Sequence, residues 1–420
     1  MARSQAVSDL VGAVRRVDVA IIGGGMVGLT LAAALGDAGL AVAVIDREDP
    51  AEALDRAHDG RSSAIAYGSQ RALAALGVWP GMAADAAPIL DIRVSDGESL
   101  LFLHYDHADI GDAPFGHIVE NRAIRRALMA RVADLAAVSH LAPAEVATVT
   151  RGAGHVDIRL ADGTWLRAAL VVGAEGRGSP LRKSAGIAVT EWAYPQTGIV
   201  CTIVHERPHR GIAHERFQPA GPLGVLPMTD DADGRHRSSI VWTEHADLAP
   251  AVLALDDDAF SAELARRFGP SLGALHVHGG RWSYPLSLIH AERYVDRRLA
   301  LIGDAAHAMH PIAGQGLNMG LRDVAALSEV LVDAHRLGRD IGAADVLARY
   351  QRWRRFDNVV LMAVTDGLNR LFSNDVPPLR LARDLGLAAV DRVPPLKRLF
   401  MRHAMGTLGQ RPRLISGARL

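Results

Sequence analysis

The sequence of 420 residues is poor in cysteine and lysine, with Cys201 as its one cysteine and Lys183 and Lys397 as its two lysines. One cysteine excludes an intramolecular disulfide framework and a paired-cysteine metal site, and it fits a reducing compartment, so we expect a cytoplasmic protein. Neither lysine lies in a recognisable pocket motif, which disfavours Schiff-base chemistry. No uncharged apolar stretch reaches 18 residues, so the sequence predicts no membrane-spanning helix.

An excess of charge of one sign is also missing. The 46 basic and 47 acidic residues leave a net charge of −1, which disfavours nucleic acid as a partner. With 49% hydrophobic and 22% charged residues, the composition is that of a folded globular protein. At about 150 residues per domain, the length predicts two or three domains.

The first pattern that is present is a strand, a glycine turn, a helix and a second strand. Residues 17–22 are β-formers, 29–38 are helix-compatible, and 41–45 are again apolar. The turn carries Gly23, Gly25 and Gly28 in GxGxxG spacing, and Asp46 ends the second strand. In a βαβ unit these glycines allow a tight turn, close approach of a diphosphate and close helix packing, while Asp46 accepts from ribose hydroxyls. We therefore predict a dinucleotide site.

Two more buried strands end in glycine turns. Residues 168–172 lead into 173–179, and residues 299–302 lead into 303–307. Because ligands bind outside the carboxyl ends of parallel strands, we expect the turns near Gly25, Glu175 and Asp304 to converge on one elongated ligand. Residues 194–204, 216–226 and 238–243 predict short strands of a separate antiparallel layer, and the chain from Gly320 onward is mostly helical.

A longer motif carries a family resemblance. Residues 298–318, RLALIGDAAHAMHPIAGQGLN, resemble the GD motif of flavoprotein aromatic hydroxylases, the class of para-hydroxybenzoate hydroxylase, and the resemblance assigns Asp304 to the FAD ribityl chain. Residues 173–182 resemble the DG motif of that family, with Glu175 where the family usually has Asp. Softer matches resemble the ubiquinone-biosynthesis hydroxylases of the UbiH, UbiF and VisC type; they lie at 59–61, 116–122, 192–196, 215–217, 284–286 and 314–318.

The resemblance implies an FAD-dependent monooxygenase. A nicotinamide donor, NAD(P)H, would reduce FAD, and O₂ would then give a flavin hydroperoxide that hydroxylates an aromatic ring, here a polyprenyl phenol or quinone precursor of ubiquinone. Because the flavin supplies the difficult step, the protein needs no nucleophile of its own. Two alternatives stay open: an FAD hydroxylase of a soluble aromatic metabolite, and a non-catalytic flavin-binding scaffold of a biosynthetic complex.

The expected cofactor residues follow from these motifs. Near the flavin edge we expect Pro311, Gly314, Gly316, Leu317 and Asn318, with the start of a helix near Leu317 facing the pyrimidine ring. Arg61 and Arg122 either reach FAD or form surface ion pairs. The complete FAD set is Gly23, Gly25, Gly28, Asp46, Arg61, Arg122, Glu175, Gly303, Asp304, Gly316, Leu317 and Asn318.

Several further side chains have two interpretations. His307 and His310 have HxxH spacing, but without a third ligand at helical spacing we predict no metal site and a capping or flavin-adjacent role instead. Trp192, Tyr194 and Gln196 either line the substrate cavity or pack in the core. We expect Cys201 to be a buried, inert thiol.

The predicted fold is α/β, with a Rossmann-type FAD domain around a parallel sheet, an inserted antiparallel substrate sheet and a C-terminal helical segment. The expected division assigns 15–80, 106–185 and 280–340 to the FAD domain, 81–105 and 186–279 to the substrate domain, and 341–420 to the helical segment. Residues 377–420 carry nine Lys or Arg against two Asp. This basic, partly apolar tail predicts either a solvated helical cap or a peripheral contact with the inner face of the membrane.

Overall fold

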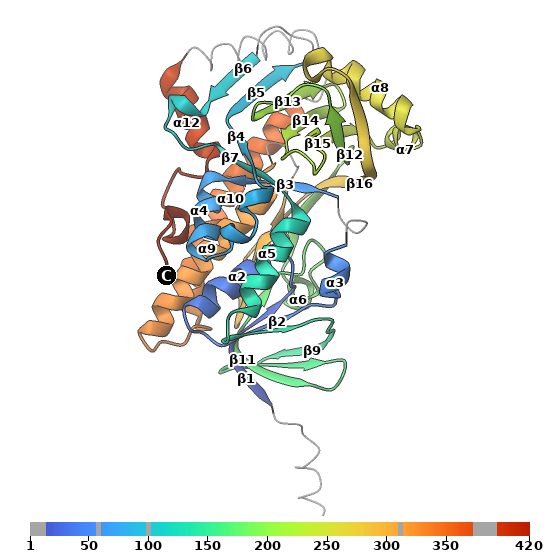
Figure 1. Cartoon of the computed structure of the whole chain (residues 1–420). Coiled ribbons are helices and arrows are strands. Elements are labelled where there is room, and N and C mark those ends of the chain that lie inside the picture. Colours follow the sequence, from blue (N-terminus) through green and yellow to red (C-terminus); the bar gives the residue numbers. More distant parts are fainter. Residues whose placement is uncertain (1–13, 56–59, 98–101, 310–313, 373–392) are drawn as a thin grey trace, which may run out of the picture.

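A computed structural model of the chain describes residues 14–55, 60–97, 102–309, 314–372 and 393–420 (Figure 1). Within these ranges, no helix is both long enough and apolar enough to span a bilayer. The fold is built on two large sheets, one mostly parallel and one mostly antiparallel, and on a small three-stranded sheet between them. The α/β fold class is confirmed, with parallel and antiparallel sheets and helices at the C-terminal end.

The parallel sheet has the strand order β17-β18-β11-β1-β2-β8. Its centre pairs β1 in parallel with β11 and with β2, as the buried apolar runs predict. A two-stranded ribbon, β9 and β10, continues from β11. The bounds are β1 (Arg15–Ile22), β2 (Val42–Ile45), β8 (Val138–Leu141), β9 (Val146–Arg151), β10 (Val156–Leu160), β11 (Trp165–Gly173), β17 (Val295–Asp296) and β18 (Leu299–Leu301).

The antiparallel sheet has the order β19-β16-β12-β15-β14-β13-β5-β6. The segment predicted at 216–226 forms two strands, β13 and β14, joined by a tight turn. β12 spans 17 residues and is longer than predicted. The bounds are β5 (Asp91–Asp96), β6 (Phe102–Asp106), β12 (Val189–His205), β13 (Ile212–Gln218), β14 (Gly221–Pro227), β15 (His236–His245), β16 (Leu275–Ala291) and β19 (His307–Ala308). The small sheet pairs β7 (Gly116–Glu120) with β3 (Ser62–Ala66) and β4 (Ala87–Ile89).

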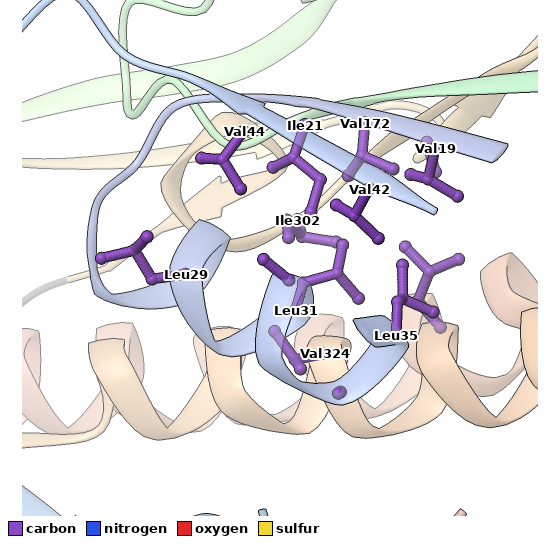
Figure 2. Packing of buried hydrophobic residues seen from close by; sticks show 14 of the residues in the cluster. Val19, Ile21, Leu29, Leu31, Leu35, Val42, Val44, Val172, Ile302 and Val324 are labelled. Carbon is purple, nitrogen blue, oxygen red and sulfur yellow. The ribbon is translucent and has the colours of Figure 1, made fainter. Parts of the chain in front are cut away.

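Helices cover the parallel sheet in layers. Leu31 and Leu35 of α2 lie between the strands and Val324 of α9, so α2 is buried on both sides (Figure 2). Helix α8 covers the outer face of the antiparallel sheet, where Phe260 packs on Trp242. The helix bounds are α2 (Met26–Asp37), α3 (Pro50–Ala53), α4 (Tyr67–Ala75), α5 (Asn121–Ala133), α6 (Pro180–Ser184), α7 (Ala249–Leu253), α8 (Asp257–Phe268), α9 (Gly316–Arg336), α10 (Ala344–Phe372) and α12 (Pro394–Ala404). The division of the chain into the three expected segments stays a prediction.

Candidate active site

One cavity of about 1260 Å³ lies between the parallel sheet and the inner face of the antiparallel sheet. Its wall includes Gly25 from the turn after β1, Gly176 and Arg177 from the turn after β11, and Asp304 from the turn after β18. The start of α9, residues 314–318, also lines it. The three distant turns therefore meet at one cavity, as the topology of a parallel sheet predicts.

The glycine turn after β1 is shaped by contacts that a side chain would block. Gly23 has φ +107°, and a Cβ there would lie 2.3 Å from the carbonyl oxygen of Ala174. A Cβ at Gly28 would lie 1.9 Å from the carbonyl oxygen of Gly23. A Cβ at Gly25, in contrast, would meet no atom within 4 Å, because this residue faces the cavity. Helix α2 starts here without a side-chain cap or an acidic residue in its first turn, which leaves its N–H groups available for an anion.

Asp46 lies beside the glycine turn, at the carboxyl end of β2. Its carboxylate accepts hydrogen bonds from the backbone N–H of Gly24 and, at 3.0 Å, from that of Glu48. His140, at the end of β8, lies on the same side, with Nε2 3.1 Å from the position that a Gly24 Cβ would take. That Nε2 is buried and has no hydrogen-bond partner within the described residues. Burial lowers the pKa of His140 more than the Asp46 carboxylate raises it, so the ring is neutral at pH 7.

The turn after β11 contains Glu175 and Arg177, whose side chains have different roles. Glu175 bends back over α6: it accepts from Ser179 Oγ and, at 3.3 Å, from the backbone N–H of Leu181, and burial raises its pKa. Its side chain thus caps α6 and does not line the cavity. Arg177 does line the cavity, with Nε 3.4 Å from Asp304 Oδ2 and Nη1 3.1 Å from Ser287 Oγ.

The turn after β18 rests on a buried carboxylate of α9. Asp323 accepts from the backbone N–H of Gly303 at 3.1 Å, from His307 Nε2 at 2.5 Å and from Arg354 Nε at 2.9 Å. Burial acts to raise the pKa of Asp323, but His307 and Arg354 outweigh it and hold the pKa at about 2. His307 therefore ties the turn to α9, while Asp304 on the same turn faces the cavity. His310, predicted beside His307, lies outside the described residues.

Helix α9 begins at the cavity wall. Asn318 accepts from the backbone N–H of Ala66 at 2.9 Å and donates to the carbonyl oxygens of Ala64 at 2.8 Å and Gly314 at 3.0 Å. It thereby fastens the end of β3 to the first turn of α9. A Cβ at Gly316 would meet no atom within 4 Å, so this residue leaves the helix N-terminus open to the cavity. Leu317 also lines the cavity, and Pro311 lies outside the described residues.

The two arginines predicted to reach FAD or form surface ion pairs lie in different places. Arg61 lines the cavity, with its guanidinium 6.0 Å from the ring centre of Tyr284. Arg122, on the first turn of α5, does not line it, whereas Asn121 and Arg125 do. Arg125 was not predicted from the sequence, because it lies beyond the matching segment 116–122. The signal was the helical spacing of Asn121 and Arg125, four residues apart and so on one face of α5.

The aromatic pair predicted at the start of the antiparallel sheet packs in the core. Trp192 and Tyr194 contact a cluster that includes Met319, and the Tyr194 hydroxyl donates to Asp366 Oδ1 at 2.7 Å. Gln196 Nε2 donates to the carbonyl oxygen of Ala220 at 2.7 Å. Cys201 is buried in the outer core of the sheet, where burial raises its pKa to about 12, as expected for an inert thiol. None of these four residues lines the cavity.

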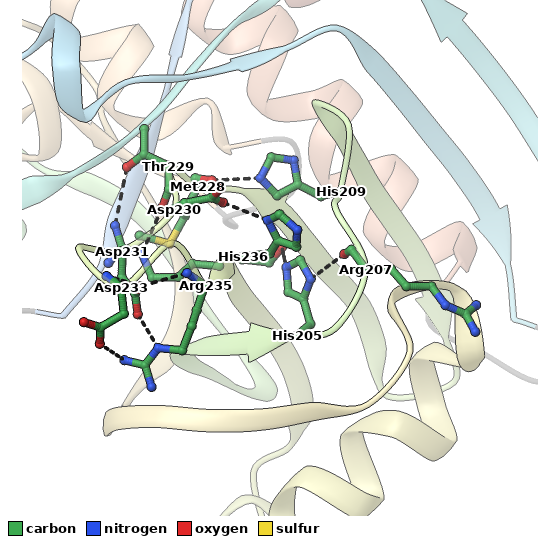
Figure 3. Close-up of polar contacts among 12 residues, drawn as sticks. His205, Arg207, His209, Met228, Thr229, Asp230, Asp231, Asp233, Arg235 and His236 are labelled. Atoms are coloured by element: carbon green, nitrogen blue, oxygen red, sulfur yellow. Dashed lines mark hydrogen bonds and ion pairs between the residues drawn. The ribbon is translucent and has the colours of Figure 1, made fainter.

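A second group of titratable residues gathers where β12 ends and β15 begins, and its three histidines do not line the cavity (Figure 3). His205 Nε2 is 2.9 Å from Ser238 Oγ, and His236 Nδ1 is 3.0 Å from Asp230 Oδ1. His209 Nε2 is 2.8 Å from the carbonyl oxygen of Met228. Each imidazole has a protein hydrogen-bond partner, so the group holds loops together.

The part of the cavity wall that the antiparallel sheet forms is largely apolar. Alternate residues of the antiparallel strands face inward, because successive side chains of a strand point to opposite faces. The wall residues from this sheet include Ile92, Val94, Leu103, Tyr105, Val200, Ala213, Glu215, Phe217, Leu226, Val241 and Tyr284. Leu361 and Val364 of α10 and Phe400 of α12 line the opposite side.

Comparison with known proteins finds a matching family, similar sequences and a similar solved structure. A family model described as FAD binding domain matches residues 16–357. Ubiquinone hydroxylase UbiL of Rhodospirillum rubrum is 54% identical over 406 residues, which cover 96% of this chain and 93% of that protein. The 3-demethoxyubiquinol 3-hydroxylase of Escherichia coli is 35% identical, with 93% of this chain and 98% of that protein covered. The solved structure of p-nitrophenol 4-monooxygenase PnpA from Pseudomonas putida shares the fold, with a TM-score of 0.78 at 21% identity over 94% of this chain and 100% of that chain.

Proposed function

The chain belongs to the FAD binding domain family, among the hydroxylases of ubiquinone biosynthesis, and from this membership we propose that it hydroxylates the aromatic ring of a polyprenylated ubiquinone precursor. The observation that carries the proposal is the cavity between the two large sheets, which joins a dinucleotide cradle to an apolar wall. Its volume of about 1260 Å³ exceeds the roughly 300–1,000 Å³ of an ordinary ligand pocket. There is room for an elongated cofactor and a second molecule.

The residues around the cradle fit FAD. The open N-terminus of α2 at Gly25 would receive the diphosphate, Asp46 would accept from the adenosine ribose, and Asp304 would bind the ribityl chain. The buried and unpaired Nε2 of His140 fits a polar group of the adenosine half. The N-terminus of α9 at Gly316 would face the pyrimidine edge of the flavin, where its positive end favours negative charge.

When bound, FAD would take two electrons from NAD(P)H and activate O₂, so that one oxygen atom enters the ring and the other leaves as water. The sequence contains no second GxGxxG motif. The donor would therefore bind without a Rossmann domain of its own. The protein would hold the ring against the flavin and exclude water, which the apolar wall is suited to do.

The wall also supports a prenylated substrate. Val364, Leu371 and Phe400 line the cavity and are at the same time 47%, 42% and 42% exposed. They form an apolar mouth through which an isoprenoid chain would leave the cavity while the ring stays inside.

We further propose a peripheral contact of α12 with anionic lipid. Leu399 and Phe400 are exposed on this helix, and Arg398 and Arg402 are exposed too, so the helix presents both apolar and basic groups to its surroundings. Co-sedimentation with anionic vesicles at low salt, lost at high salt, would support the contact. Retention by other biosynthetic proteins and none by vesicles would favour assembly in a complex instead.

Two measurements test the function. The purified protein should be yellow, and the released cofactor should have the mass of FAD. With NAD(P)H and O₂, the enzyme should hydroxylate a short-chain prenylated phenol faster than a simple phenol. Faster turnover of the simple phenol would favour a soluble aromatic metabolite, and FAD-loaded protein that consumes no O₂ with any donor or phenol would favour a non-catalytic scaffold.

A further inference from the structure

The inner face of β15 carries a buried hydroxyl in the wall of the cavity. Thr243 is 0% exposed and lines the cavity. Ser239 and Val241, four and two residues earlier on the strand, share this face and line the cavity with it. Thr243 Oγ1 has no hydrogen-bond partner in the part of the chain that the structure describes. It therefore lacks the bond that a buried hydroxyl ordinarily makes.

The surroundings of Thr243 account for its methyl group but not for its hydroxyl. A Cβ at Gly221, which has φ +130°, would lie 2.5 Å from Thr243 Cγ2, so the methyl group fills the space over this glycine. Next to them, the amide of Gln196 donates to the carbonyl oxygen of Ala220 at 2.7 Å and accepts from Asn369 Nδ2 at 3.2 Å. These two bonds tie β12 to the turn before β14 and to α10, and the Thr243 hydroxyl takes no part in them.

Packing alone would favour valine at position 243. Valine has nearly the same shape as threonine and would bury no polar atom, whereas a buried hydroxyl without a hydrogen bond costs free energy. A polar group of a ligand that reached the hydroxyl would remove this cost. Because Thr243 lies in the cavity wall, we expect that group to belong to a molecule bound in the cavity.

This part of the wall adjoins the start of α9. Asn369, which bonds Gln196, lies one turn after Thr365, and Thr365 lines the cavity. Leu361, one turn before Thr365, lies in one apolar cluster with Met319 of the first turn of α9. The proposed function places that turn at the edge of the flavin. The substrate ring, which has to meet the flavin, would therefore lie within reach of this wall.

We propose that the Thr243 hydroxyl donates a hydrogen bond to an oxygen atom on the aromatic ring of the substrate and so sets which ring carbon faces the flavin. The inference rests on the proposed function and adds a specificity-determining residue to it. Because the threonine hydroxyl is uncharged, it can donate to a phenol, methoxy or quinone oxygen alike. The site thus selects rings that already carry an oxygen substituent, and no covalent bond is made or broken at Thr243.

The test compares wild type with Thr243→Val, which removes the hydroxyl and keeps the shape. A geranyl-substituted phenol, its methyl ether and geranylbenzene, which has no ring oxygen, are titrated into the FAD-loaded proteins, and binding is followed by the change in flavin absorbance. We expect Thr243→Val to bind the phenol and the ether about 3- to 10-fold more weakly, the range for one neutral hydrogen bond. Geranylbenzene should bind equally to both proteins. Thr243→Ser, which keeps a hydroxyl, should discriminate among the ligands as wild type does.

Two controls check the state of the variants. Thermal unfolding of the FAD-loaded proteins without ligand should show Thr243→Val to be at least as stable as wild type. A clearly lower stability would mean that the hydroxyl is bonded within the protein, and it would overturn the inference. Thr190→Val, at an exposed threonine of β12 that does not line the cavity, should bind all three ligands as wild type does.

The binding results separate the possible failures. Equal affinity of wild type and Thr243→Val for the phenol and the ether overturns the inference and leaves the proposed function standing. An equal loss for all three ligands also overturns it, because the effect is then one of packing. If wild type binds none of the ligands, the proposed function itself is wrong and the inference falls with it.

Discussion

At the scale of single residues, Asp323 holds the turn that presents Asp304 to the cavity. Asp323→Asn removes the charge that pairs with the buried Arg354 and His307, and we expect a loss of about 3–5 kcal/mol in the free energy of unfolding at pH 7. The folded pKa of about 2 lies below the ordinary 3.8 of an aspartate, so the carboxylate stabilises the fold above about pH 4 and less as the pH falls towards 2. Urea unfolding between pH 2 and 8 should show the gap between wild type and variant closing below pH 4. A gap that is constant with pH would contradict this role.

At His140, unlike at Asp323, we expect a substitution not to lower the free energy of unfolding. His140→Leu replaces a buried nitrogen that has no partner among the described residues, so the FAD-free protein should be as stable as wild type or slightly more stable. FAD affinity should fall about tenfold, as expected for one lost hydrogen bond. Fluorescence titration of FAD and urea unfolding of the FAD-free protein measure the two effects separately. Unchanged affinity would mean that the ring does not contact the cofactor.

The sequence could identify some of these residues and not others. Asp304, Gly316 and Asn318 belong to one contiguous motif, and the structure puts all three on the cavity wall. His140 and Arg125 carry no local motif. His140 reaches the glycine turn because β8 pairs in parallel with β2, and that register is a tertiary property.

At the scale of elements, two glycines of one motif should respond differently to the same substitution. Gly28→Ala places a Cβ 1.9 Å from a backbone oxygen that cannot move without opening the turn, and it should destabilise the FAD-free protein by about 1–3 kcal/mol or more. Gly25→Ala adds its Cβ to open space, so stability should stay within about 1 kcal/mol of wild type while FAD affinity falls. Thermal unfolding and FAD titration of both variants provide matched controls. Normal FAD affinity in Gly25→Ala would argue against diphosphate binding at this turn.

Whether a segment forms a strand or a helix was predictable where the sequence shows one clear pattern of apolar residues and glycines. The strand, turn and helix around Gly25 lie within a few residues of their predicted positions, because apolar runs and glycines mark each boundary. The ends of β12 were not predictable in this way. The strand continues through two irregularities in its pairing with β16, one between Ala193 and Thr197 and one between Cys201 and Thr202. Bulges of this kind depend on the partner strand, and the sequence of β12 alone does not contain them.

At the scale of the whole molecule, convergence of the three turns followed from one rule about parallel sheets. The position of the antiparallel sheet does not follow from that rule. The alternation of side chains along a strand tells which residues share a face, but not what that face covers. Glu215 illustrates the difference. Its inward direction follows from the two-residue period of a strand, while its place in the wall of the same cavity as Gly25 depends on how the two sheets pack. The cavity is therefore a property of the assembled fold.

The mouth of this cavity leads to a prediction that involves both the substrate wall and the C-terminal helices. Phe400→Glu puts a charge on the apolar mouth, and it should raise KM for a long-chain prenylated phenol by about tenfold, which corresponds to roughly 1.4 kcal/mol of lost apolar contact. A substrate with one isoprene unit, too short to reach the mouth, should keep its KM. Leu337→Glu, at a residue that is 73% exposed and does not line the cavity, controls for added surface charge. Equal KM changes for short and long chains would show that the isoprenoid tail leaves the cavity elsewhere.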